Sequence, residues 1–167
     1  MDADTTMMND LSIRDADYDS LPDRGAIVEL LDMYAQEDSG TGVELAPEVQ
    51  RDMVAGLENH PTSRVLLAWV NGQAVGIAVC FVGFSTFAAK PLVNLHDFAV
   101  RPEFRRRGVG RRIMQRVEEW ARELDCCKIT LEVRHDNAAA QQLYRNLGFR
   151  DPGIPTLFWA KTLDCER

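Results

Sequence analysis

The residues with the clearest chemical potential lie between positions 94 and 120, where a short apolar run is followed by arginines and two glycines. The spacing Arg105-x-x-Gly108-x-Gly110 precedes a stretch whose apolar residues repeat at three- and four-residue steps. This order predicts a strand, a glycine turn and an amphipathic helix. Glycines let the backbone approach a ligand closely, and the N–H groups of the first helical turn have no intrahelical partner. The stretch therefore predicts a phosphate site at a helix N-terminus.

The distribution of charge supports a polyphosphate ligand. The formal net charge is −7, yet seven of the 19 Lys and Arg residues fall between Arg101 and Arg116, with Glu103 as the one acid among them. Arginines at a helix N-terminus oppose the helix dipole, and an anion would neutralise them. The alternative is a basic, solvated helix start. A Walker motif and a dinucleotide fingerprint are excluded, because no Gly-Lys-Ser/Thr follows and the third glycine is missing.

At these residues the sequence resembles the pyrophosphate-binding motif of the GCN5-related N-acetyltransferases. A second segment, which runs from Asn137 through Tyr144 to Phe149, resembles that family's Asn-x-x-Ala-x-x-Leu-Tyr-x-x-x-Gly-Phe block. The two motifs and the elements around them cover roughly residues 93–160. The resemblance implies an enzyme that uses acetyl-CoA as co-substrate. No Cys or His spacing typical of a metal site occurs, so no metal is expected.

The resemblance also implies where acetyl-CoA binds. The strand before the turn would pair its backbone with the pantetheine arm at Phe98 and Val100, with N–H groups near the thioester carbonyl. Asn137 would hydrogen-bond the same arm, although a plain N-cap role is an equal alternative. The expected cofactor-binding residues are Phe98, Ala99, Val100, Arg105, Arg106, Arg107, Gly108, Val109, Gly110, Arg111, Asn137 and Tyr144.

Two residues in the strand are candidates for work on the acceptor amine. His96 lies four residues before Val100, at the position that carries a histidine base in arylalkylamine acetyltransferases and a glutamate in diamine acetyltransferases. As a histidine, it is expected to act as the base, directly or through water. Strict alternation places Asp97 on the opposite face. By resemblance Asp97 helps to bind a cationic substrate. The alternatives are a histidine satisfied within the sheet and a buried structural aspartate.

Three aromatic residues complete the expected site. Tyr144 matches the family tyrosine that lies near the CoA sulfur, and we expect it to donate a proton there, with a packed helix tyrosine as the alternative. The segment Phe84-Ser-Thr-Phe87 resembles the Tyr-Ser-Thr-Trp segment of diamine and thialysine acetyltransferases. Together with the negative net charge it favours a small cationic amine, with Phe84 and Tyr34 near the substrate. Core packing is the alternative for both.

The elements that must position these residues can be read from the pattern of apolar residues and turns. Asn71-Gly72 between two apolar runs is the strongest short hairpin signal in the chain. The expected order β-α-α-β-β-β-α-β-α-β predicts an α/β domain with a central mixed sheet flanked by helices, and it is also the order of the acetyltransferase family. The expected elements are strand 11–14, helices 24–37 and 47–59, strands 65–70, 74–82 and 92–100, helix 109–124, strand 128–133, helix 137–147 and strand 156–161.

The whole chain sets the remaining expectations. Its 167 residues fit a flexible N-terminus at 1–10 and a single acetyltransferase domain at 11–167. No apolar run reaches the ~20 residues of a membrane span, and the acidic start lacks the features of a targeting signal. Four cysteines without a framework fit a reducing cytoplasm. The negative charge argues against nucleic acid as a partner. A homodimer is the working expectation.

The sequence therefore leads to an N-acetyltransferase that acts on a primary amine of a small molecule by direct attack in a ternary complex. Two other functions stay open at this point. One is a non-catalytic module that binds acetyl-CoA as a sensor or interaction subunit. The other is an acetyltransferase whose acceptor is a protein amine.

Overall fold

The computed structural model describes residues 10–38, 40–154 and 157–163. Its elements in chain order are β1 (Ser12–Asp15), α2 (Leu21–Gln36), α3 (Pro47–Asn59), β2 (Ser63–Val70), β3 (Gln73–Ser85), β4 (Lys90–Val100), the 3-10 turn η2 (Pro102–Phe104), α4 (Val109–Glu123), β5 (Ile129–Leu131) and α5 (Ala138–Asn146). The N-terminus expected to be flexible, residues 1–10, lies outside the described residues apart from Asp10.

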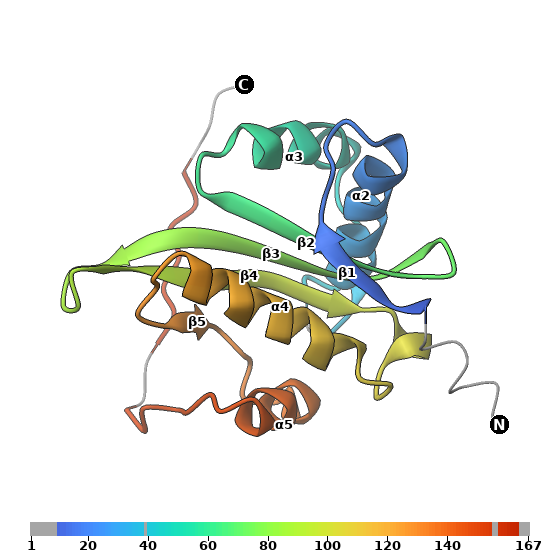
Figure 1. Ribbon diagram of the computed structural model, residues 1–167. Coiled ribbons are helices and arrows are strands. Elements are labelled where there is room, and N and C mark those ends of the chain that lie inside the picture. Colours follow the sequence, from blue (N-terminus) through green and yellow to red (C-terminus); the bar gives the residue numbers. More distant parts are fainter. Residues whose placement is uncertain (1–9, 39, 155–156, 164–167) are drawn as a thin grey trace, which may run out of the picture.

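The strands form one mixed sheet in the order β1-β2-β3-β4-β5, with α2 and α3 on one face and α4 and α5 on the other (Figure 1). The first four strands pair antiparallel, and β5 runs parallel to β4. The hairpin at Asn71-Gly72 forms as expected, with φ of +50° and +77° at its two turn residues, the left-handed pair typical of a tight hairpin. The expected α/β fold class is confirmed.

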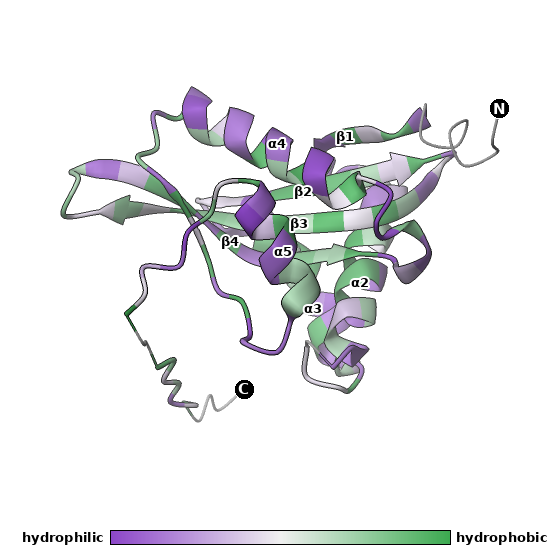
Figure 2. Ribbon diagram, turned by 90° about the horizontal axis from the view of Figure 1, so that it is seen from below, coloured by the Kyte–Doolittle hydropathy of each residue, from purple (hydrophilic) through white to green (hydrophobic). Residues whose placement is uncertain are grey.

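Each face of the sheet has its own apolar core. Ile113, Met114 and Val117 of α4 are fully buried against one face. Ile27 and Leu30 of α2 are fully buried against the other face. Figure 2 shows hydrophilic residues along the outer side of α4. The residues with three- and four-residue apolar spacing are therefore the buried faces of amphipathic helices, as predicted, and helices cover the sheet on both sides.

Helix α2 begins earlier than expected. Ser20 caps it, and its side chain accepts a hydrogen bond from the Asp23 N–H at 3.4 Å. Pro22 lies in the first turn, where a missing N–H costs nothing. The buried Asp23 carboxylate accepts a forked pair of hydrogen bonds from Arg14 of β1, one of them 2.7 Å long. This ion pair fixes β1 to the start of α2.

Strands β3 and β4 extend further than expected, and the last expected strand does not form. The loop expected at residues 83–91 shrinks to the four residues between the ends of β3 and β4. Thr156 lies outside the described residues, and residues 157–161 form no strand. Leu157, Phe158 and Trp159 are 75–84% exposed, so this segment gains neither a ladder nor a buried face. Among the described residues, no helix is long and apolar enough to cross a membrane.

Candidate active site

The turn between β4 and α4 has the backbone expected of an anion site. Arg106 and Gly108 both adopt left-handed conformations, with φ of +60° and +87°. Gly108 is the N-cap of α4, and no side chain caps the helix there. The N–H groups of the first turn thus have neither an intrahelical partner nor a side-chain cap. Successive N–H groups around left-handed residues make a concave site for an anion, so the residues present fit a diphosphate.

The two glycines of the motif serve different purposes. Gly108 has open space around its Cα, and its need for glycine comes from the positive φ. A Cβ at Gly110 would lie 3.2 Å from the Phe98 ring and 3.4 Å from the Leu143 side chain. Gly110 therefore lets α4 pack closely against both β4 and α5.

The arginines around the turn also divide into two kinds. The Arg105 guanidinium donates to the Val100 carbonyl at 2.8 Å and to the Glu37 carboxylate. It thus ties the turn to the end of β4 and to the chain just after α2. The Arg107 guanidinium lies 5.8 Å from the Phe104 ring centre. The side chains of Arg106, Arg107 and Arg111 are exposed, whereas Val109 is buried and offers the site its backbone alone.

Strand β4 has an edge that β5 does not cover. The β4–β5 ladder joins three residue pairs, from Val93 opposite Ile129 to Leu95 opposite Leu131. The two strands then separate while β4 continues to Val100, still paired with β3. Backbone N–H and C=O groups need partners when they are covered. The separated edge, which contains Phe98, Ala99 and Val100, can therefore accept an extended ligand arm.

Helix α5 borders this edge. Asn137 is its N-cap, since the Asn137 side-chain oxygen accepts from the Ala140 N–H at 3.0 Å. The N-cap role, which was the alternative for Asn137, is therefore present. Tyr144 is 8% exposed, and its ring centre lies 6.3 Å from that of Phe98 and 5.6 Å from that of Phe149. Burial raises the pKa of Tyr144 to about 12, helped by Tyr34. The phenol consequently keeps its proton at neutral pH.

A β-bulge in β4 sets the directions of the two polar residues. Asp97 pairs with Val79 of β3. The next pair joins Leu95 to Cys80, which leaves His96 as the extra residue of the bulge. His96 and Asp97 therefore both face α2 and α3, whereas Leu95 packs toward α4. The expectation that His96 and Asp97 lie on opposite faces was wrong, because it assumed unbroken alternation.

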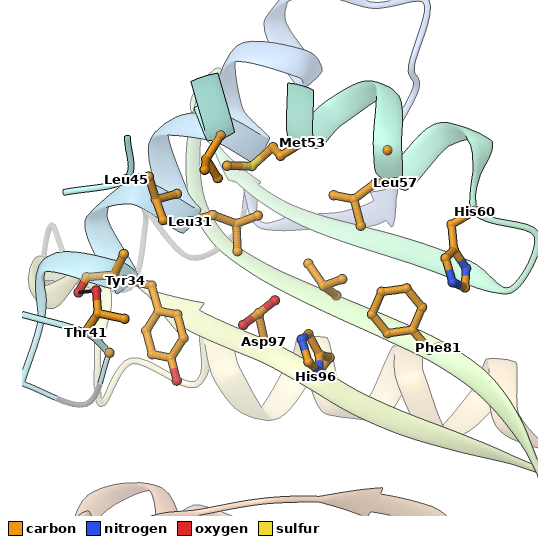
Figure 3. A pocket seen from close by; sticks show the side chains of 15 residues that line it. Leu31, Tyr34, Thr41, Leu45, Met53, Leu57, His60, Phe81, His96 and Asp97 are labelled. Carbon is orange, nitrogen blue, oxygen red and sulfur yellow. Dashed lines mark hydrogen bonds between the residues drawn. The ribbon is translucent and has the colours of Figure 1, made fainter. Parts of the chain in front are cut away.

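His96 and Asp97 lie at a pocket of about 470 Å³ between the sheet and the helices α2 and α3 (Figure 3). This volume is within the ~300–1,000 Å³ of small-molecule sites. Tyr34 lines the pocket as expected. His60 and Phe81 also line it; their ring centres are 4.8 Å apart, and Phe81 is 5.4 Å from His96. Sequence reasoning gave neither residue a role, because their convergence depends on how β3 and α3 pack.

The Asp97 carboxyl group is half-buried at the pocket. Burial raises the pKa of the Asp97 carboxyl above its ordinary value, and His96 acts in the opposite direction. Within the described part of the chain, no N–H, guanidinium or ammonium donates to this carboxylate. Burial also raises the pKa of Tyr34, and the charge of Asp97 adds to this effect. Asp97 is therefore a half-buried carboxylate that has His96 as a favourable neighbour but pairs with neither Lys nor Arg among the described residues.

The structure does not bring Phe84 to this pocket. Phe84 pairs with Pro91 near the end of the β3–β4 hairpin and is 63% exposed. The hairpin projects beyond the helices (Figure 1). Phe84 is not among the described residues that line the pocket. No group of three or more His, Cys, Asp or Glu side chains suited to a metal occurs in the described part either.

The chain belongs to the acetyltransferase (GNAT) family, whose family model matches residues 27–149. It is similar to the uncharacterized N-acetyltransferase YhfO of Bacillus subtilis, at 32% identity over 58% of this chain and 64% of that protein. It is 34% identical to N-alpha-acetyltransferase RimI of Mycobacterium tuberculosis over 52% of this chain and 54% of that protein. It is also 34% identical to thialysine N-epsilon-acetyltransferase of Bos taurus, over 46% and 45% respectively. The chain thus spans about half to two thirds of the length of these relatives.

Solved structures share the fold over almost the whole chain. An aminoglycoside acetyltransferase from a soil metagenomic sample, in complex with sisomicin, matches with a TM-score of 0.77 and 16% identity over 93% of this chain and 99% of that chain. AAC(6')-Iy in complex with the bisubstrate analogue CoA-S-monomethyl-acetylneamine matches with a TM-score of 0.75 and 18% identity, over 92% and 99%. At these identities the similarity shows a common fold.

Proposed function

We propose that the chain is an acetyl-CoA-dependent N-acetyltransferase that acetylates a primary amine of a small molecule by direct attack in a ternary complex. The observation that carries this proposal is the position of β4. Its open edge leads into the Gly108 turn, and the bulge in the same strand presents His96 and Asp97 to a pocket. A donor on the edge and an acceptor in the pocket would meet at this strand.

The residues that would hold acetyl-CoA lie in one continuous path. The N–H groups from Arg106 to Arg111 would bind the diphosphate, and the open edge from Phe98 to Val100 would bind the pantetheine arm. Asn137 borders this path and can donate from its amide nitrogen while its oxygen caps α5. When bound, acetyl-CoA supplies an activated acetyl group. The family membership of the chain supports this assignment.

The protein's own groups divide the remaining work. Asp97 would hold the cationic amine, because a half-buried carboxylate favours a positive neighbour. The amine must lose a proton before its nitrogen can attack, and the exposed His96 would take that proton and pass it to water. Tyr144, which stays protonated, would donate to the leaving sulfur. The apolar walls of the pocket would lower the local dielectric constant around a bound amine and so strengthen these interactions.

Direct attack on the donor is favoured over a route through an acetyl-cysteine. Cys80 is fully buried, and burial raises the pKa of its thiol to about 12. Burial also raises the pKa of Cys126. A thiolate is the reactive form of cysteine, so these environments suppress nucleophilic attack. Neither residue lines the pocket among the described residues.

The test combines calorimetry with a thiol-release assay. The protein should bind acetyl-CoA at one site per chain and release CoA when amines are added. Binding without release for any small amine or peptide would instead identify a sensor or interaction module. Release with peptides alone would identify a protein amine as the acceptor.

A further inference from the structure

The side chains that line the pocket beside His96 and Asp97 indicate which kind of ligand it binds. Under the proposed function it receives the acceptor, and the inference below rests on that assignment. Its walls come from α2, α3, the connection between them and β3. Most of the side chains are apolar, and the main ones are Leu31, Leu45, Met53, Leu57, Val79 and Phe81.

The charged groups of the pocket are few. Among its described lining residues, Asp97 is the one acid, and neither Lys nor Arg occurs. The Thr41 hydroxyl lies 3.2 Å from the Ala35 carbonyl and donates to it. Tyr34 and the two histidines are the other polar side chains of the lining. The pocket thus offers one fixed negative charge and no group that would neutralise a carboxylate on the ligand, apart from the titratable histidines.

The charged and apolar parts of the pocket are separated in space. In Figure 3 the Asp97 carboxylate lies on β4 between Tyr34 and His96, while Leu31, Met53 and Leu57 face it from the helices. The Phe81 ring lies beside His96 and continues the wall toward His60. A ligand whose amine is next to Asp97 would therefore place the rest of its body among apolar and aromatic side chains.

We propose that the acceptor is a primary monoamine with an apolar body, aliphatic or aromatic, whose single ammonium pairs with Asp97. A second ammonium, as in a diamine, a polyamine or an aminoglycoside, would be desolvated against apolar walls without a partner. The carboxylate of an amino acid would meet the same cost beside the like charge of Asp97. Burying an unpaired charge is far more costly than burying the matching apolar group.

Hexylamine and 1,6-diaminohexane test this proposal, because they differ by one terminal ammonium. We expect kcat/KM to be about 100-fold higher for hexylamine. Phenylalaninamide and phenylalanine form a second pair that differs by one carboxylate, and the amide should be the better substrate. Equal or better turnover of the diamine would overturn the proposal.

A variant of Met53 sharpens the test. Met53 is a half-buried wall residue on α3, and glutamate has a similar length. Met53→Glu should move the ratio of the two kcat/KM values by about 10-fold toward the diamine, since it supplies a second carboxylate. Met53→Gln has the same shape without the charge and should keep the preference for hexylamine. A preference that is the same in both variants would contradict the charge argument.

Failure of this inference can be told apart from failure of the proposed function. If diamines, aminoglycosides or peptides are acetylated better than hexylamine, the enzyme assignment stands and the inference is wrong. If acetyl-CoA binds but no amine releases CoA, the proposed function is wrong. In that case the affinities of hexylamine and 1,6-diaminohexane, measured by calorimetry with CoA present, test the inference independently of the enzyme assignment. Tighter binding of hexylamine supports it, and equal or weaker binding overturns it.

Discussion

Asp23 and Asp97 are two covered carboxylates that the protein treats in opposite ways. Asp23 has no exposed surface and is held by the Arg14 guanidinium and by the N–H of Asp17 at 2.9 Å. The hydrogen bond from Arg14 is the main reason that the pKa of Asp23 is lowered. Asp97 has no such partner among the described residues, and burial raises its pKa.

The difference indicates which positively charged group pairs with each carboxylate. The partner of Asp23 belongs to the chain, so the pair stabilises the fold and joins β1 to α2. Under the proposed function, the partner of Asp97 is the ammonium of the substrate, because the protein itself solvates this carboxylate poorly. Replacing Asp97 should therefore lower activity and raise stability. Replacing Asp23 should lower stability and leave activity unchanged.

The largest effect is expected from Asp97→Asn. The amide keeps the shape and removes the charge, so kcat/KM for an amine should fall by about 30- to 1000-fold, mainly through KM. The melting temperature should rise by about 1–3 °C at neutral pH, because a poorly solvated charge is removed. Steady-state kinetics and a thermal melt check both. Parental KM in this variant would show that Asp97 does not bind the amine.

Asp23→Asn should have the opposite profile. The buried partner of Arg14 is lost, and the free energy of unfolding should fall by about 2–3 kcal/mol. This value lies below the ~3–5 kcal/mol for breaking a fully buried pair, because the Arg14 side chain is 45% exposed and solvent screens it. Denaturant unfolding measures the loss. Below the melting transition kcat/KM should stay at the parental value, and a strong loss of activity would break the contrast between the two aspartates.

Tyr144→Phe is expected to affect catalysis alone. Phenylalanine keeps the ring contacts with Phe98 and Phe149 and removes the donor. We expect kcat to fall by about 10- to 100-fold, with acetyl-CoA affinity and melting temperature close to the parental values. If kcat is unchanged, or falls only in step with stability, Tyr144 is a packing residue.

The smallest effects are those of pH on stability, and their signs differ. The folded pKa of Asp23 is lowered, so its contribution is present above the unfolded pKa of ~3.9 and is lost as pH falls through the folded value. The folded pKa of Asp97 is raised, so its contribution is present below ~3.9 and is lost as pH rises through the folded value. Melting curves from pH 3 to 7 should show the Asp23→Asn deficit and the Asp97→Asn gain both growing with pH. A gain for Asp97→Asn that shrinks with pH would reverse our assignment.

Local signals explain which parts of the fold could be predicted. Asn71-Gly72, Gly108 and Asn137 act through their own backbone or their nearest neighbours, and the hairpin, the N-cap of α4 and the cap of α5 form as expected. The start of α2 was missed although Ser20 and Pro22 signal it. Each of these features depends on a few residues that are close together in the sequence.

The rest of the site depends on contacts between distant segments. The bulge at His96 arises from the register with β3, and no glycine or proline marks it. The convergence of His60 and Phe81 on the pocket requires the packing of α3 on the sheet. The expected strand at residues 156–161 needed a sheet edge to pair with, which apolar composition alone does not supply. Sequence patterns therefore predicted the backbone of the turn before α4 better than the pocket between the sheet and the helices α2 and α3.

Under the proposed function, two separate binding sites meet at β4, and paired calorimetric titrations of two variants test this arrangement most directly. Gly108→Val forces a β-branched residue into a left-handed conformation. It should weaken acetyl-CoA binding by about 1–3 kcal/mol and leave hexylamine binding intact. Asp97→Asn should do the reverse. If each variant loses both ligands equally, or neither loses any, the account of two sites joined by one strand is contradicted.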